Sequence, residues 1–195
     1  MNLGLQLNYI RQRLEELYRR REIDLRKDWK FMTIWAGNND LCISCIKGLK
    51  GLAFHADIFE LHIRKIVEKV RFEIPKTVIN LMAVMNLSQT YDVSQRTPHC
   101  RIQRTLIARI ECPCTTLGQW ARDSMDELAA EYNKRLFRIA MDYQARDIDN
   151  FAVIYDPGMG GLNLGKHENA EMYFSPLDCF HPSLLAHEMI AKSAW

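Results

Sequence analysis

The sequence lacks a long apolar segment. Its 195 residues contain no run of eighteen or more apolar residues, the length that a membrane-spanning helix needs. Charged side chains interrupt the first thirty residues, which lack the apolar core of a secretory signal peptide. The sequence as it stands therefore carries no signal for export or for insertion into a membrane.

A strong imbalance of charge is also absent. Lys and Arg number 26 and Asp and Glu number 24, so the formal net charge is only +2. The one basic cluster, Arg19 to Arg21, is flanked by Glu15, Glu16 and Glu22 on a helical pattern, which is typical of a solvated helix face. This composition argues against nucleic acid as a partner.

Cysteine, in contrast, is plentiful. Six are present at close spacings: Cys42, Cys45, Cys100, Cys112, Cys114 and Cys179. An even number favours disulfides and an oxidising compartment, which conflicts with the missing export signal unless the chain lacks its true N-terminus. A zinc site is the alternative, but the Cys112-Pro-Cys114 spacing fits a zinc knuckle poorly. Disulfides are favoured, and their pairing stays open.

Apolar residues recur with two periods along the chain. Helical spacing marks residues 5–22, then Phe59 to Val70 ahead of Pro75, then Met125 to Ile139, and a last helix from about Ser183 to Ala194. Short continuous apolar runs predict buried strands at 31–36, 77–84 and 151–155. This alternation predicts an α/β protein with a parallel sheet, and the length predicts one domain.

Two polar clusters follow these elements. Gly37 to Asp40 comes directly after the first predicted strand, where ligands bind in parallel sheets. The second cluster, Asp178 to Ser183, opens the last helix, and an Asp three residues before a His can hold one ring nitrogen while the other accepts a proton. Asp-x-x-His alone is a weak signal, because the spacing is common by chance.

Taken together, "GNNDLC" at 37–42 and "DCFHPS" at 178–183 resemble two conserved blocks of the GDSL (SGNH) hydrolase family, in its membrane-associated phospholipase B branch. The resemblance covers nearly the whole chain. It implies a flavodoxin-like three-layer α/β/α sandwich that lacks its first strand and also its second strand. The missing first strand would pair with the strand that ends at Gly37, whose edge would then be open.

The resemblance also implies roles for four residues in the hydrolysis of lipid esters. His181 would be the general base and Asp178 would orient it. The Asn39 side chain would donate to the oxyanion, an interaction commonly worth about 3 kcal/mol, and Gly37 would let the backbone approach the substrate. No metal or cofactor is implied. The expected partners are a phospholipid or another lipid ester and a membrane surface, in an extracellular or membrane-associated setting.

The nucleophile that this family uses is not found among these residues. The family carries its serine in a Gly-Asp-Ser block near the N-terminus, whereas no serine precedes Ser44 here. Ser124, in "RDSM", lies in a helical stripe, and Ser44, Ser175 and Ser183 lack the strand-turn-helix context of a nucleophile. We therefore expect residues 1–195 to form a single partial domain that is inactive alone.

Two alternatives remain beside this interpretation. The chain could be a catalytically dead lipid-binding or interaction module, which would bind lipid without hydrolysis. A zinc-binding protein is the second. Cys179 is not favoured as a thiol nucleophile, because its place between Asp178 and His181 favours a side chain that points elsewhere, into the core or a disulfide.

Overall fold

The computed structural model describes residues 2–46 and 54–193, and the chain divides into two compact units. The first unit draws on the described residues of Met1–Gly37, Leu52–Val84 and Ala130–Gly160. The second draws on those of Asn38–Gly51, Met85–Ala129 and Gly161–Trp195. The expectation of a single domain over residues 1–195 stays a prediction.

A parallel sheet forms the centre of the first unit. Its strands are β1 (Lys30–Ile34), β2 (Thr77–Met82) and β3 (Phe151–Asp156), in the order β1-β2-β3. Both pairings are parallel, and the middle strand is buried along nearly its whole length. The predicted α/β class with a parallel sheet is confirmed, and β1 lies at an edge of the described sheet, as expected.

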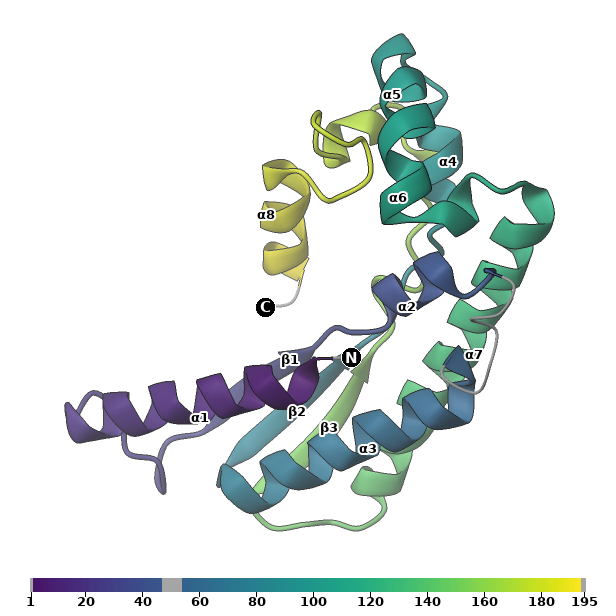
Figure 1. Cartoon of the computed structure of the whole chain (residues 1–195). Helices are drawn as coiled ribbons and strands as arrows, with labels where there is room; N and C mark the ends of the chain where they lie inside the picture. Colours follow the sequence, from purple (N-terminus) through teal and green to yellow (C-terminus); the bar gives the residue numbers. More distant parts are fainter. Residues whose placement is uncertain (1, 47–53, 194–195) are drawn as a thin grey trace. The chain divides into compact units, whose positions relative to one another are not determined.

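Three helices pack on one face of this sheet: α1 (Leu3–Arg19), α3 (Ala56–Glu73) and the later part of α7 (Gln119–Gln144). Figure 1 shows α1 and α3 in front of the strands. Phe59 of α3 stacks on Tyr132 of α7 with ring centroids 3.9 Å apart, and Tyr143 of α7 meets Phe151 of β3 edge to face. The apolar stripes predicted for α3 and α7 thus form the helix–sheet core, whereas Leu7 is the one buried residue of α1.

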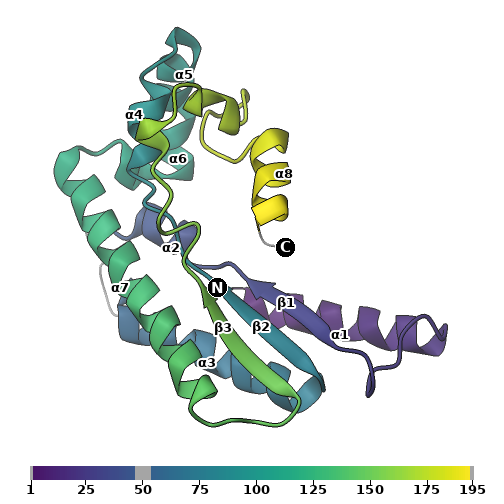
Figure 2. The ribbon, with the colours of Figure 1, turned by 180° about the vertical axis from the view of Figure 1, so that it is seen from behind.

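The opposite face of the sheet is partly exposed. Figure 2 shows it from behind, with the strands in front of α3. Side chains of alternate residues share a face of a sheet, and on this face Phe31 is 47% exposed and Ile154 is 38% exposed. Two layers of the predicted sandwich, the sheet and one layer of helices, are therefore directly visible in the first unit.

Short helices make up the second unit. They are α2 (Asn38–Ile43), α4 (Gln89–Ser94), α5 (Pro98–Gln103), the π-helical turn Arg104–Ala108, α6 (Arg109–Glu111), the start of α7 and α8 (Leu184–Ser193). Three 3-10 turns connect them, at Pro113–Thr115, Leu164–Lys166 and Ala170–Tyr173. Only α8 and the start of α7 were predicted from the sequence.

Three disulfides cross-link this second unit: Cys42–Cys112, Cys45–Cys114 and Cys100–Cys179. The prediction of disulfides is confirmed, and the pairing that the sequence left open is now fixed. Because every cysteine of the chain is bonded to another, the zinc–thiolate alternative is wrong, and the expectation that Cys179 points into the core or a disulfide is confirmed. No helix in the described part of the chain is long and apolar enough to cross a membrane.

Candidate functional site

The candidate site is built on a tight loop before α8. A β-bridge pairs Phe174 with Pro182, and the backbone N–H of Ser175 donates to the carbonyl of His181 at 2.8 Å. Within the loop, Cys179 has a left-handed backbone with φ of 55° and donates its N–H to the carbonyl of Ser175. These contacts turn the chain back on itself, so residues on either side of Cys179 face each other.

Asp178 and His181 form a hydrogen-bonded pair in this loop, as the spacing predicted. The ring Nδ1 of His181 lies 2.9 Å from Oδ2 of Asp178. The other carboxylate oxygen accepts the backbone N–H groups of Phe180 and His181, at 2.8 and 2.9 Å. Because an ionised carboxylate only accepts hydrogen bonds, Nδ1 carries the proton and Nε2 is left able to accept one.

The loop stabilises the charged form of Asp178. Burial alone would raise its pKa, but the hydrogen bonds from the His181 ring and from the two backbone amides outweigh burial and lower the pKa below its ordinary value. The Asp178 side chain is 16% exposed, whereas that of His181 is 56% exposed. A shielded carboxylate therefore holds an imidazole whose other nitrogen faces outward, which is the arrangement of an oriented general base.

Contacts with α5 hold the loop in place. The disulfide Cys100–Cys179 ties the residue between Asp178 and His181 to α5. The ring Nε2 of His99, also on α5, lies 2.8 Å from the carbonyl oxygen of Pro176. A covalent bond and a polar contact on the same helix leave the loop little freedom, so the pair is preorganised.

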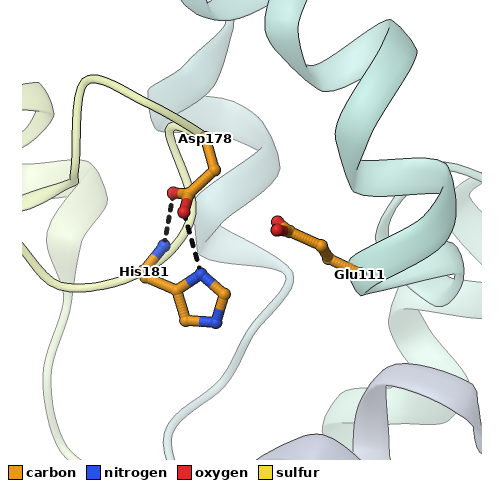
Figure 3. Close-up of side chains that lie close together, drawn as sticks. All are labelled: Glu111, Asp178 and His181. Atoms are coloured by element: carbon orange, nitrogen blue, oxygen red, sulfur yellow. Dashed lines mark hydrogen bonds and ion pairs between the residues drawn. The ribbon is translucent and has the colours of Figure 1, made fainter.

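Sequence reasoning missed a third charged side chain beside this pair. Glu111, the last residue of α6, points its carboxylate toward Asp178 and His181 (Figure 3). One potential ligand atom from each of the three side chains lies within 4.8 Å of the other two. The only signal for Glu111 in the sequence is its place next to Cys112, and that signal has no value until the disulfide pairing is known.

Asn39 lies on α2 with an exposed side chain. The side chain of its neighbour Asn38, in contrast, is held by a hydrogen bond, in which Oδ1 accepts the backbone N–H of Met85 at 3.2 Å. Across the residues that the structure describes, no hydrogen bond of the Asn39 side chain is found. The oxyanion role of Asn39 stays a prediction.

Gly37, the fourth predicted site residue, belongs to the first unit. Its φ is +116°, and a Cβ added there would lie 3.0 Å from side-chain carbons of Phe59 and Val84 and 3.1 Å from Tyr132. Packing of the chain against α3 and α7 therefore explains this glycine fully. Its predicted role in the approach of the backbone to a substrate stays a prediction.

None of the four serines considered from the sequence hydrogen bonds to the imidazole. Ser44 is buried and donates to the carbonyl of Leu41, Ser175 accepts the N–H of Leu177, and Ser183 donates to the carbonyl of Met172, while Ser124 lies within α7. Within residues 2–46 and 54–193, no hydroxyl side chain hydrogen bonds to the ring of His181. The described residues thus contain an oriented base without a nucleophile beside it.

Comparison with known proteins gives consistent matches. The sequence model of the GDSL-like lipase/acylhydrolase family matches residues 2–194. The chain is similar to "Phospholipase B1, membrane-associated" of Mus musculus, with 26% identity over 183 residues, and to the protein of the same name of Homo sapiens, with 26% identity over 178 residues. Each match covers 89% of this chain and 12% of the relative, so the chain spans a small part of the proteins it resembles.

Proposed function

Because the chain belongs to the GDSL-like lipase/acylhydrolase family, we propose that it supplies the general base and an oxyanion donor for hydrolysis of lipid esters through an acyl-serine intermediate. One observation carries the proposal, namely the hydrogen-bonded Asp178–His181 pair with the imidazole Nε2 turned outward. The name of the matched relatives points to phospholipids as the substrate class, and the resemblance to the phospholipase B branch extends this class to lysophospholipids.

In this mechanism, His181 acts twice. Its Nε2 takes the proton of a serine hydroxyl as that oxygen attacks the ester carbonyl, and it then returns the proton to the leaving alcohol. Asp178 holds the ring in the required tautomer and stabilises the imidazolium that forms. The Asn39 amide donates to the oxyanion. His181 then takes a proton from water as the water attacks the acyl-serine, and it returns that proton to the serine oxygen as the fatty acid leaves.

The proposed setting is extracellular or membrane-associated. Three disulfides with sequence separations of 70, 69 and 79 residues support an oxidising compartment. The relatives are called membrane-associated, which supports a lipid surface as the place of action.

Residues 1–195 by themselves are proposed to have no turnover, because acyl transfer by this route needs a serine beside His181. The test compares two proteins on lysophosphatidylcholine: the 195-residue chain and the product of the complete transcript that encodes it. We expect fatty-acid release from the complete product alone. Fatty-acid release by the 195-residue chain at a comparable rate would contradict the proposal that this chain lacks the nucleophile. No release by either protein would contradict the proposal of a lipid ester hydrolase.

A second candidate is a lipid-binding module without hydrolysis, which the lack of a hydroxyl at His181 in the described residues favours. A second measurement distinguishes it from the hydrolase: sedimentation of the complete product with lysophosphatidylcholine-containing vesicles, alongside the assay of fatty-acid release. Binding without fatty-acid release would support the module and rule out the hydrolase.

A further inference from the structure

Glu111, Asp178 and His181 bring metal-binding side chains together from two separate segments. Glu111 ends α6, while Asp178 and His181 come from the loop before α8 (Figure 3). Their nearest ligand atoms all lie within 4.8 Å of one another. Glu111 has no ion pair with any described residue, so its carboxylate is available as a third ligand beside Asp178 and His181.

We propose that these three side chains bind a divalent transition-metal ion, with Zn²⁺ as the best fit. One imidazole nitrogen and two carboxylate oxygens are ligands that zinc accepts, with water as a fourth ligand, whereas Mg²⁺ and Ca²⁺ prefer oxygen alone. Ligand atoms around tetrahedral zinc lie roughly 3.4 Å apart. The present spacing of up to 4.8 Å is wider than this, so the side chains would have to close around the ion as it binds.

The disulfides preorganise both segments of the site. Glu111 is followed directly by Cys112, which is bonded to Cys42. Cys179, between the other two ligands, is bonded to Cys100. One oxygen of the Asp178 carboxylate is also held by two backbone N–H groups, which fixes the direction of the other. A site whose ligands are held before the ion arrives binds more tightly, because less freedom is lost on binding.

Metal binding has a consequence that rests on the proposed function. Zinc at Nδ1 of His181 would take the place of the proton there, so the neutral ring would carry its proton on Nε2 and could not accept the proton of a serine. Zinc would therefore inhibit the complete product reversibly, and a chelator would restore its activity.

The test is isothermal titration of the oxidised 195-residue chain with zinc chloride alone. The expected result is one site per chain, with affinity weakened at least about tenfold in Glu111→Gln and in His181→Ala. Glu188→Gln and His187→Ala, changes at exposed positions of α8, are matched controls that should bind as the wild type does. Far-UV circular dichroism confirms that each variant is folded.

Two results would overturn the metal site: no uptake of zinc by the wild type, or wild-type affinity in folded Glu111→Gln. A separate arm adds zinc to the complete product during hydrolysis of lysophosphatidylcholine. If zinc binds through Glu111 but leaves hydrolysis unchanged, the metal site is supported and the role of His181 in the reaction is refuted. Inhibition of the wild type by zinc, together with no inhibition of Glu111→Gln, supports both the metal site and the role of His181 in the reaction.

Discussion

Two neighbouring asparagines on α2 have different environments. Asn38 accepts the backbone N–H of Met85, whereas Asn39 is exposed. We expect Asn38→Ala to lower the free energy of unfolding by about 1 to 2 kcal/mol, because it leaves that N–H without its partner. Asn39→Ala should change it by less than about 0.5 kcal/mol. Urea denaturation of the 195-residue chain measures both.

The same pair of variants separates stability from chemistry. If the Asn39 amide donates to the oxyanion, Asn39→Ala lowers kcat of the complete product by roughly a hundredfold or more without loss of stability. Equal activity in Asn39→Ala and the wild type would exclude the donor role.

The charge of Asp178 contributes stability that depends on pH. Its folded pKa is lowered, so the contribution is present above the ordinary Asp pKa of about 3.9 and is lost as the pH falls through the lowered value. We expect Asp178→Asn to be less stable than the wild type at pH 6 and to approach it near pH 2.5. Denaturation at both pH values tests this, with Asp149→Asn, a change at an exposed carboxylate, as the control. If Asp178→Asn were less stable than the wild type by the same amount at both pH values, the contribution of the Asp178 charge would be contradicted.

At the scale of the elements, Gly37 is where the chain after β1 meets α3 and α7. Gly37→Ala should lower the free energy of unfolding by about 2 to 5 kcal/mol, because a side chain is strained at this φ and collides with three packed side chains. Gly4→Ala is the matched control, since a Cβ at Gly4 has no heavy atom within 4 Å and α1 favours alanine. Thermal denaturation compares the two, and similar melting temperatures would contradict the packing role of Gly37.

Length decides which elements could be predicted from the sequence. α3 has 18 residues and α7 has 26, so each shows several turns of an apolar stripe. α4 and α5 have six residues each, too few for a period to stand out or for a helix to be stable by itself. Tertiary contacts and disulfides hold these short helices, and neither can be read from local sequence.

The same reasoning applies to the candidate site. Asp178 and His181 are three residues apart, so their pairing is a local property that the sequence could predict. Glu111 reaches them only through the folding of α5 and α6 and the pairing of six cysteines. The relation of Asn39 to the pair depends on long-range packing as well, which is why its role is still a prediction.

At the scale of the whole molecule, the two units differ in covalent cross-linking. All three disulfides lie in the second unit and the sheet of the first has none. Loss of a native disulfide typically costs about 2 to 5 kcal/mol. We expect reduction to remove hydrogen-exchange protection from α4 and α5 while β2 stays protected. Simultaneous loss of protection in β2 would contradict separate units and favour the single domain predicted from the sequence.

The central claim, that His181 is the base of a lipid ester hydrolase, is tested most directly by kinetics of the complete product on lysophosphatidylcholine. His181→Ala should lower kcat by about a thousandfold or more, because it removes the imidazole that Asp178 orients to take the serine proton. His187→Ala, a change at an exposed histidine of α8, should retain wild-type kcat. A folded His181→Ala protein that hydrolyses the lipid as fast as the wild type would contradict the claim.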